Sequence, residues 1–454
     1  MRYFIPAILF FAVISCSKIE PLFTNTSRQV IISQSDEHLA FPSVEKLNNG
    51  DLVCVFRRGK SHASPDGNIL LSRSKNKGQS WSAADTIIST RLDCRDPSVM
   101  KLKDGSLLLN FFQSNYDNSG KIIGALGVFV SRSFDDGLSW YSPKMVILEN
   151  FDWAACSAKI LELKDGTLLL PLYAGRKGEK STALVAVSHD LGRNWQEFHT
   201  VAFDSSGKID FNEPALCAFP DGRIMCVLRT AGDGHFQYKS FSKDGGITWS
   251  PPERTSLQGQ ASSLLLTKEN ILLCAYRDFS PAGTSYSVSY DYGTTFEREF
   301  IIHPFKGDRA YPELVQFDGG IFVTYYEALP GHSQILGSYI PVKPPAAPKA
   351  LKASISRDST IVLRWNRVHE AYYYQIFRDV AKPDTTGFLP KFNGARIATV
   401  LNNSYNDTNV APDNIYRYQV KAVSSHSELL KNSGAVSSPS KIAEIHFIKQ
   451  EEIK

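Results

Sequence analysis

The chain has 454 residues, of which 43% are hydrophobic and 21% are charged. A chain of this length and composition is too long for one core and is not disordered, so two or three globular units are expected. The formal net charge at pH 7 is +4, which excludes the broad basic field of a nucleic-acid-binding protein, so any basic site must be local.

The N-terminus is typical of an export signal. An apolar run over residues 4–14 follows a basic start and is too short to span a membrane. The stretch Val13-Ile14-Ser15-Cys16 resembles the lipobox of bacterial lipoproteins, which implies cleavage before Cys16 and lipidation of its thiol. The alternative is an ordinary signal peptide with an incidental cysteine. We expect a signal peptide over 1–15, a tether over 16–33 and a lipid anchor in the bacterial cell envelope, on either its periplasmic or its surface-exposed face.

The remaining cysteines show no C-x-x-C spacing, so a zinc site built on them is not expected. Most lie in apolar runs such as "IMCVL" and "ILLCAY", where a buried thiol behaves as a small hydrophobic group. We expect few or no disulfides among them. These cysteines are Cys54, Cys94, Cys156, Cys217, Cys226 and Cys274.

Two motifs recur in phase over residues 34–342. The first is Ser-x-Asp-x-Gly-x-x-Trp, in which the Asp can bond nearby backbone N–H groups, the Gly permits a left-handed bend and the aromatic ring can pack between strands. This chemistry explains every fixed position, so the motif is interpreted as a turn of the scaffold and not as catalytic machinery. The copies start at Ser74, Ser133, Ser188, Ser242 and Ser289, with Asn76 in place of the first Asp and Phe296 in place of the last Trp.

The second motif is an apolar strand, a turn that usually contains Asn-Gly or Asp-Gly, and another apolar strand. Such dipeptides between apolar runs are strong hairpin signals because they accept positive φ at little steric cost. Six such hairpins, in phase with the Ser-x-Asp-x-Gly-x-x-Trp motif, predict six four-stranded blades. They open at Phe41, Asp96, Cys156, Glu213, Ala261 and Tyr311.

These turns are Asp boxes, and residues 34–342 resemble the sialidase-like six-bladed propeller family, also described by its neuraminidase or BNR Asp-box repeats. The composition changes to a Pro-rich linker at 343–349, and residues 350–448 alternate apolar positions as a β-sandwich does. Trp365, Tyr373 and Tyr416-x-Tyr418 resemble a fibronectin type III module, expected to be a spacer. The predicted fold class is all-β: a six-bladed β-propeller followed by a β-sandwich.

The chemistry is expected at one mouth of the propeller channel. The first strand of each blade lines the axis and the second ends on the same side, so polar residues at these points converge. Arginine gathered there suits a carboxylate, because its planar fork donates two parallel hydrogen bonds. The alternative is a set of inter-blade ion pairs. The candidates are Arg58, Arg95, Asp96, Tyr173, Arg176, Glu213, Arg229, Arg277, Tyr311 and Glu313.

The resemblance implies roles for several of these. Tyr311 matches the family's nucleophile and Glu213 the base that activates it, while Arg229 and Arg277 match two of the three arginines that hold a substrate carboxylate. The chain departs from the family in its first blade, where Ala40-Phe41-Pro42 replaces Arg-Ile-Pro.

Two assignments remain open at this point. Arg95, from the neighbouring blade, is the candidate substitute for the missing arginine. Asp66, on the loop where the family keeps its acid/base, competes with Asp96 on the axis, and either would serve if burial raised its pKa.

The predicted function is that of an exo-acting glycoside hydrolase, related to sialidases, that removes a terminal acidic sugar such as sialic acid. One alternative is an exo-hydrolase of arabinan or a uronic-acid-containing glycan, with Glu213 and either Asp96 or Glu313 as paired carboxylates. Another is a non-catalytic glycan-binding lipoprotein in which Trp153, Tyr173 and His235 make contacts. No organic cofactor is implied, no cluster has metal-ligand spacing, and a monomer with a glycan partner is expected.

Overall fold

The computed structural model describes residues 29–117, 119–268, 270–317, 320–340, 346–356, 358–368, 371, 373–382, 389–423 and 437–447. Within these ranges the chain is all-β and contains no helix, and hence none that is long and apolar enough to cross a membrane. The expected signal peptide, Cys16 and most of the expected tether lie outside the described residues.

The first part of the chain forms antiparallel sheets whose strands follow one another in sequence. The first sheet comprises β2 (His38–Lys46), β3 (Leu52–Gly59), β4 (Asn68–Ser74) and β5 (Asp85–Ile88). The second comprises β6 (Asp93–Lys101), β7 (Leu107–Tyr116), β8 (Ile122–Ser133) and β9 (Lys144–Val146). In the third, β10 (Trp153–Ala155) and β11 (Leu161–Glu162) both pair with β12 (Leu168–Gly175), which leads to β13 (Thr182–Ser188) and β14 (Glu197–Ala202).

Strand β18 joins two of these units into one continuous sheet. Its first half pairs with β17 and its second half with β19. The sheet order is β15 (Asp210–Ala218), β16 (Ile224–Ala231), β17 (Phe236–Ser242), β18 (Glu253–Leu266), β19 (Leu272–Phe279), β20 (Ala282–Ser289) and β21 (Glu297–Pro304).

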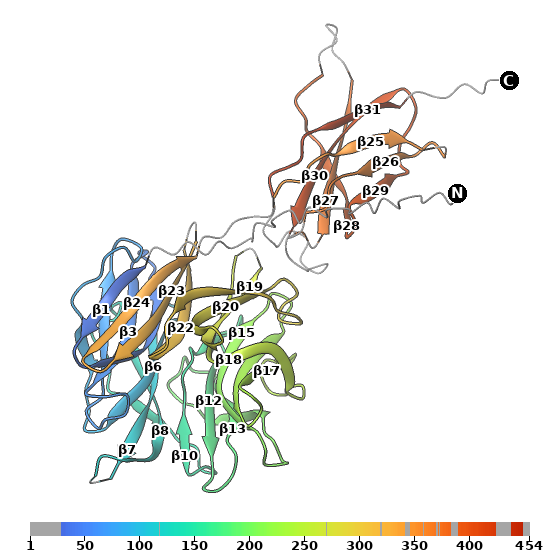
Figure 1. The fold of residues 1–454 in the computed structure, drawn as a ribbon. Coiled ribbons are helices and arrows are strands. Elements are labelled where there is room, and N and C mark those ends of the chain that lie inside the picture. Colours follow the sequence, from blue (N-terminus) through green and yellow to red (C-terminus); the bar gives the residue numbers. More distant parts are fainter. Residues whose placement is uncertain are drawn as a thin grey trace, which may run out of the picture.

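The N-terminal strand completes the last sheet of this part. Strand β1 (Val30–Ser35) pairs antiparallel with β24 (His332–Ile340), beyond β23 (Gly320–Leu329) and β22 (Asp308–Phe317). Figure 1 shows β1 beside β24. Strand β2 contacts both β6 and β22, so the first and last sheets are neighbours and the arrangement closes on itself. The closing strand begins at Val30, four residues before the predicted start of the propeller.

The Asp boxes fold as the turns that the sequence predicted. In the second copy Ser133 Oγ accepts a hydrogen bond from Gly137 N at 2.9 Å and donates one to Asp135 Oδ1 at 2.8 Å. Asp135 Oδ1 also accepts the Ser139 N–H at 2.9 Å, and Trp140 Nε1 donates to the Gly137 carbonyl at 3.2 Å. Gly137 has a φ of 84°. Hydrogen bonds, above all from Ser139, lower the pKa of Asp135 to about 2, so this carboxylate is a turn acceptor and not an acid.

Five innermost strands carry the same irregularity. The pairing register of β2, β6, β15, β18 and β22 shifts near the middle of each strand, as at a β-bulge. At each shift a non-glycine residue has positive φ, and on β22 Ala310 has it as well as Tyr311. In four cases a proline follows, which cannot donate to the ladder. A bulge turns its side chain out of the regular alternation, so these five positions are aimed differently from the rest of their strands. They are Phe41 (57°), Asp96 (46°), Glu213 (43°), Ala261 (54°) and Tyr311 (47°).

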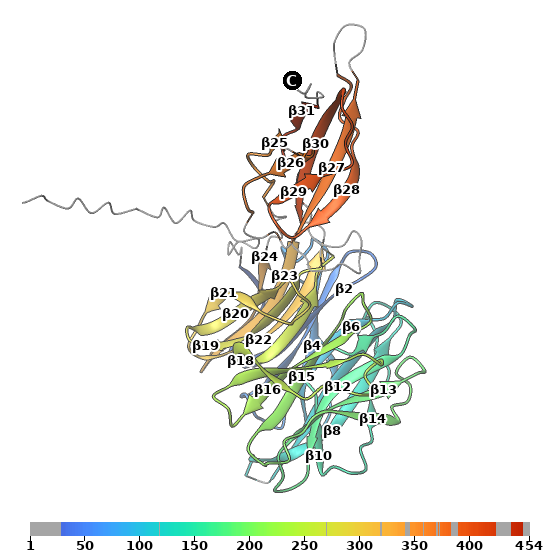
Figure 2. The same ribbon diagram turned by 90° about the vertical axis from the view of Figure 1, so that its right-hand side faces the viewer.

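The C-terminal part forms two antiparallel sheets that pack face to face (Figure 2). One sheet has the order β25 (Lys352–Ile355), β26 (Ile361–Arg364) and β29 (Ser404–Asp407). The other has the order β28 (Ala395–Val400), β27 (Tyr373–Ala381), β30 (Asn414–Val423) and β31 (Ala443–Phe447). Trp365, Tyr374 and Tyr418 belong to the core between them, with the first two rings 5.2 Å apart. This packing accounts for Trp365, Tyr416 and Tyr418, which the sequence singled out, whereas Tyr374 and not the expected Tyr373 belongs to this core.

The six cysteines beyond Cys16 are all buried and free. Burial raises the pKa of these thiols, to about 12 for Cys156. The expectation of buried, unreactive thiols is confirmed for the described part of the chain.

Candidate active site

Tyr311 and Glu213 meet although 98 residues separate them in the sequence. The Tyr311 hydroxyl donates to Glu213 Oε1 at 2.7 Å, and Arg229 Nη1 donates to the same oxygen at 2.5 Å. Arg229 Nη1 also lies 3.5 Å from the Tyr311 hydroxyl oxygen. Glu213 is only 4% exposed, and its other oxygen has no hydrogen-bond partner among the described residues. A buried carboxylate that holds a phenol and a guanidinium is an arrangement suited to proton transfer from the phenol.

Arg277 covers the other side of the tyrosine. Its Cζ lies 5.0 Å from the centroid of the Tyr311 ring, close enough for a cation–π contact. Its Nε donates to the Arg309 carbonyl at 2.9 Å, and its Nη2 donates to the Tyr326 hydroxyl at 3.4 Å. Arg229 and Arg277 therefore flank Tyr311 as the sequence predicted.

Asp96 belongs to the same cluster and is the acid that burial tunes most. It is buried, and its Oδ1 has no hydrogen-bond partner within the described ranges. Burial raises its pKa from 3.8 to about 7, the nearby Glu213 charge acts in the same direction, and Arg95 opposes both. A carboxyl with this pKa can exist in either protonation state near neutral pH, which is what a general acid/base requires.

A small cavity of about 20 Å³ separates Asp96 from Tyr311 and is lined also by Phe41, Ser157 and Ala261. This volume is enough for about one water molecule. Four of these five residues open predicted hairpins and Ser157 follows such a position, so the convergence at the axis is observed.

The phenols of this cluster are neutral at neutral pH. Burial, and then the charge of Glu213, raise the pKa of both Tyr311 and Tyr173 well above 10. Tyr173 is close enough to Tyr311, Glu213 and Asp96 to respond to their charges, so it lies in the cluster as predicted. A tyrosine here can act as a nucleophile only by passing its proton to a neighbouring base.

Arg95 reaches the cluster but is held by a network between the first two sheets. Its Nη1 donates to the His62 carbonyl at 2.6 Å and to Asp93 Oδ2 at 3.2 Å, and its Cζ lies 5.2 Å from the Phe41 ring. Asp93 also binds the fully buried Arg57, whose Nε lies 2.6 Å from Oδ1. The inter-blade ion pairs considered as an alternative therefore describe Arg57 and part of Arg95.

Three predicted residues make their contacts outside the cluster. Asp66 is partly exposed and accepts a hydrogen bond from Lys60 N at 3.3 Å, and hydrogen bonding keeps its pKa below the ordinary value although burial opposes this. Arg58 Nε pairs with Glu37 Oε2 at 3.3 Å, because strand alternation sends Arg57 inward and Arg58 to the opposite face. Arg176 is exposed and donates to the Asn150 carbonyl at 2.9 Å. Arg58 and Arg176 therefore make these contacts with residues other than Tyr311, Glu213 and Asp96.

Glu313 lies in the channel wall but is engaged elsewhere. Its Oε1 accepts a hydrogen bond from Ser263 at 2.8 Å and lies 3.7 Å from Lys159 Nζ. Lys159 also pairs with Glu45 at 3.3 Å. Glu313 is two residues beyond Tyr311 on β22, and it borders both the small cavity beside Asp96 and a larger hollow with Glu45 and Lys159. Its Oε1 is engaged by Ser263 and Lys159 and not by Glu213 or Tyr311.

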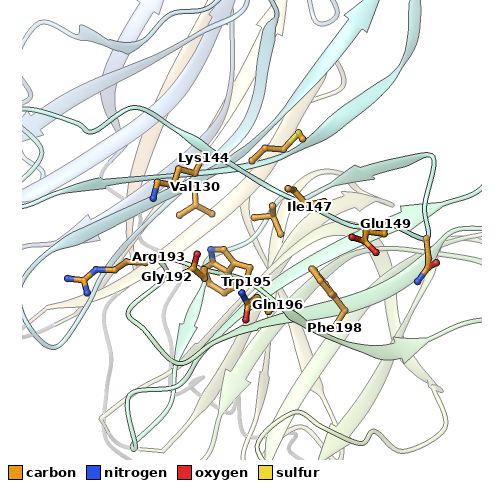
Figure 3. Close-up of a pocket in the computed structure, with 13 residues that line it drawn as sticks. Val130, Lys144, Ile147, Glu149, Gly192, Arg193, Trp195, Gln196 and Phe198 are labelled. Atoms are coloured by element: carbon orange, nitrogen blue, oxygen red, sulfur yellow. The ribbon is translucent and has the colours of Figure 1, made fainter.

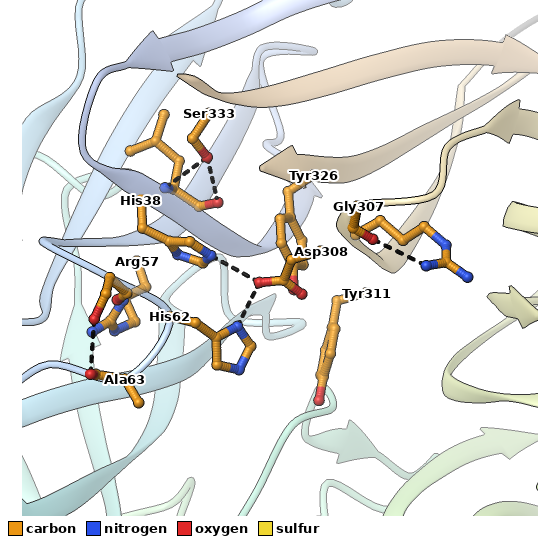
Figure 4. Close-up of polar contacts among 12 residues, drawn as sticks. His38, Arg57, His62, Ala63, Gly307, Asp308, Tyr311, Tyr326 and Ser333 are labelled. Atoms are coloured by element: carbon orange, nitrogen blue, oxygen red, sulfur yellow. Dashed lines mark hydrogen bonds and ion pairs between the residues drawn. The ribbon is translucent and has the colours of Figure 1, made fainter. Parts of the chain in front are cut away.

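A polar group without any signal in the sequence lies beside Tyr311 and is formed by Asp308, His38 and His62 (Figure 4). Asp308 Oδ2 lies 2.8 Å from His38 Nε2 and 2.6 Å from His62 Nδ1, and Asp308 Oδ1 accepts the Tyr326 hydroxyl at 2.7 Å. Although burial alone would raise it, hydrogen bonds from His38 and His62 hold the pKa of Asp308 well below its ordinary value. The expectation that no cluster has metal-ligand spacing concerned neighbours in sequence, whereas these residues are brought together by the closure of the first sheet against the last.

A separate hollow, of about 630 Å³, lies away from the Tyr311 cluster between β9 and the third Asp box (Figure 3). Val130, Ile147, Trp195 and Phe198 line it. Trp195 differs from the Trp of the other Asp boxes, because its Nε1 is buried without a hydrogen-bond partner among the described residues.

A family model described as a BNR repeat-like domain matches residues 31–323. The chain belongs to this family. The match covers Asp96, Glu213, Arg229, Arg277 and Tyr311 and ends within β23. A comparison with curated protein sequences finds no match.

Several solved structures share the fold of the BNR domain. A protein of unknown function from Dyadobacter fermentans is 28% identical, with a TM-score of 0.65, over 71% of this chain and 100% of that chain. A Hadza microbial sialidase is 19% identical, with a TM-score of 0.54, over 67% of this chain and 66% of that one. An alpha-L-arabinanase from Penicillium chrysogenum, solved with arabinobiose, is 18% identical, with a TM-score of 0.55, over 70% and 99%. Sialidases and arabinan-degrading enzymes are thus both among the structural neighbours.

Proposed function

We propose that this protein is an exo-acting glycoside hydrolase that removes a terminal acidic sugar, such as sialic acid, from glycans. The observation that carries the proposal is the 2.7 Å hydrogen bond from the Tyr311 hydroxyl to buried Glu213, with Arg229 and Arg277 on either side. A phenol that is paired with a buried carboxylate and lies between two cations is not needed for solubility. It suits a nucleophile that must be neutral when an anionic substrate arrives.

The proposed reaction begins with transfer of the Tyr311 proton to Glu213 Oε1 as the phenolic oxygen bonds to the anomeric carbon. Asp96, protonated at the start, gives its proton to the departing glycosidic oxygen. The same carboxylate then takes a proton from water, which attacks the anomeric carbon and releases the sugar, while Glu213 returns its proton to the phenolate. Arg229 contacts both Glu213 and Tyr311, so it can stabilise the charge that moves between them.

The acidic character of the sugar is proposed from the two arginines. A guanidinium fork binds a carboxylate through two parallel hydrogen bonds. Arg229 has one nitrogen, Nε, that is buried without a partner among the described residues, so its donors are not all satisfied within the protein. Asp96 is preferred to Asp66 as acid/base because its pKa is about 7 and it shares a cavity with Tyr311.

A second candidate is hydrolysis of an arabinan. It is favoured by the arabinan-degrading neighbour and by Ala40 at the point where the sialidase pattern has an arginine. Glu213 and Asp96 would then act as the paired carboxylates, and Tyr311 would only position Glu213.

The test is release of sugar from a glycan panel by the wild-type protein, Tyr311→Phe and Glu213→Gln, with Asp66→Asn as the control carboxylate variant. The sialidase-like mechanism predicts release of sialic acid, loss of at least about a thousandfold in Tyr311→Phe, and no effect of Asp66→Asn. Release of arabinose with Tyr311→Phe still active supports the second candidate. Binding without any release supports a glycan-capture protein and contradicts both enzymatic proposals.

We also infer the finer features of the architecture. The sheet order supports six four-stranded blades, with β18 shared between the fourth and fifth and with β1 closing the sixth. The two sheets after residue 350 support a fibronectin type III-like sandwich that acts as a spacer. Lipidation at Cys16 and location in the bacterial envelope are proposed from the lipobox-like sequence alone. Incorporation of labelled fatty acid into wild type and not into Cys16→Ser tests the anchor.

A further inference from the structure

Two histidines and an aspartate meet at the rim beside Tyr311. Both His38 Nε2 and His62 Nδ1 approach the same oxygen, Asp308 Oδ2, at 2.8 Å and 2.6 Å. The three atoms all lie within 4.8 Å of one another. His38 opens strand β2, His62 follows β3 in a loop, and Asp308 opens β22, so the residues converge from three places in the fold.

We propose that this cluster binds a divalent transition-metal ion of the zinc class. Imidazole nitrogen and carboxylate oxygen are donors that zinc accepts at about 2.0–2.2 Å. Ligand atoms at such distances from one ion stand about 3.0–3.5 Å apart. The separations of Asp308 Oδ2 from the two histidine nitrogens, 2.8 Å and 2.6 Å, therefore need to widen by less than about 1 Å. The two histidine nitrogens lie within 4.8 Å of each other and need to approach by at most about 1.8 Å. Imidazole ligands select against calcium and magnesium, which prefer oxygen alone.

The carboxylate is already oriented by a further shell of contacts. The Tyr326 hydroxyl donates to Asp308 Oδ1 at 2.7 Å and leaves Oδ2 for the two histidines. Arg277 Nη2 lies 4.0 Å from Asp308 Oδ1, on the side away from the imidazoles. Outer contacts of this kind fix the direction of a ligand's lone pair and are a regular feature of metal sites.

The open side of the cluster faces the Tyr311 pocket. The His62 side chain is 46% exposed, its ring lies 5.4 Å from the Phe41 ring, and the Phe41 ring lies 4.8 Å from that of Tyr311. Figure 4 shows His62 and Tyr311 projecting toward the same space. Three protein ligands leave at least one position free, as in catalytic zinc sites. If the proposed function holds, that position is within reach of a carboxylate or hydroxyl oxygen of the sugar.

The test measures metal binding directly and does not depend on glycan turnover. Untagged full-length protein is stripped with a chelator and titrated with zinc chloride by calorimetry, with calcium chloride as a second titrant. The wild type is expected to bind about one equivalent of zinc and no calcium. His62→Ala, which removes a half-exposed ligand, is expected to weaken zinc binding at least tenfold, and Asp308→Asn is expected to do the same.

His303→Ala is the matched control, because His303 Nε2 lies 2.8 Å from Glu327 Oε2 in a histidine–carboxylate pair without a second histidine. Its zinc affinity should equal that of wild type. Melting curves of the metal-free proteins verify that each variant is folded, and zinc should raise the melting temperature of wild type and the control but not of His62→Ala.

Absence of a one-equivalent zinc site, or equal zinc affinity in His62→Ala, overturns the proposal. A protein that binds no zinc but whose activity changes its pH profile in His62→Ala would show that the cluster is a proton-transfer pair. Because zinc binding is measured without substrate, these results are independent of whether the hydrolase proposal stands.

Discussion

Asp96→Asn should be more stable than the wild-type protein in alkaline solution. The substitution also removes the proposed acid/base. The wild-type carboxyl titrates near pH 7 in the folded chain and near 3.8 when unfolded. Between these values the folded state holds a proton that the unfolded state has lost, so wild-type stability falls as the pH rises. The difference between the two pKa values corresponds to about 4 kcal/mol. Asparagine has nearly the same shape and does not titrate, so the variant escapes this loss.

The assay is urea unfolding of both proteins from pH 4 to pH 8, followed by tryptophan fluorescence. Trp365 is the sole tryptophan after residue 350, so the signal comes mainly from the part of the chain that contains Asp96. The stability of Asp96→Asn relative to wild type should grow over this range by about 4 kcal/mol at most. Any constant cost of the amide cancels in this comparison. A relative stability that does not change with pH would mean that Asp96 is not the buried, raised acid described above.

Asp66→Asn is the control of opposite sign. Hydrogen bonds hold the pKa of Asp66 below its ordinary value in the folded chain, so its stabilising effect is present above the unfolded pKa and disappears as the pH falls through the folded one. The variant should therefore lose stability relative to wild type as the pH rises to about 3.8 and should change no further between pH 4 and pH 8, while turnover at neutral pH is unchanged.

Three further outcomes are expected. Lys159→Met leaves Glu313 buried without its cation and should cost about 3 kcal/mol in urea unfolding at pH 7, and less at pH 5, where the carboxyl can be protonated. Ser133→Ala removes the acceptor of the Gly137 N–H bond and should lower the free energy of unfolding by about 1 kcal/mol in thermal unfolding. Its kcat/KM should be unchanged. Lower turnover at unchanged stability would show that the Asp box takes part in catalysis. Arg277→Lys keeps the charge but loses the planar fork over Tyr311, so KM for an acidic substrate should rise about tenfold in steady-state kinetics while kcat changes less.

The sheets could be predicted because their signals are local. Each Asp box is completed within eight residues, and all hairpin turns but the fifth contain their own Asn-Gly or Asp-Gly, so the strands that flank them follow from neighbours in sequence. The closing strand could not be predicted in this way. Ser35 pairs with Ser333, and the six-residue segment VIISQS carries no sign of a partner about 300 positions away.

The site residues likewise fall into those that have a local signal in the sequence and those that do not. Glu213 and Tyr311 could be found because each opens a hairpin phrase and precedes a proline, and the family resemblance gave them roles. The choice between Asp66 and Asp96 needed burial, which neither residue's neighbours reveal. The group of His38, His62 and Asp308 had no local signature at all, because its members belong to two sheets that meet only when the first packs against the last.

The bulges explain why these particular positions carry the chemistry. In a regular strand, successive side chains point to opposite faces of the sheet. Without a bulge, the side chains of Glu213 and Tyr311 would therefore follow this alternation. The register shift and the positive φ at Glu213 and Tyr311 turn both side chains toward one rim, where they meet at 2.7 Å. Positive φ is costly for residues with a side chain, by about 1 kcal/mol or more each. Such strain is repeated at equivalent points of five strands, with Asp96 among them. If the proposed function holds, replacing Pro214 or Pro312 should lower turnover before it lowers the stability of the fold, as steady-state kinetics and thermal unfolding would show.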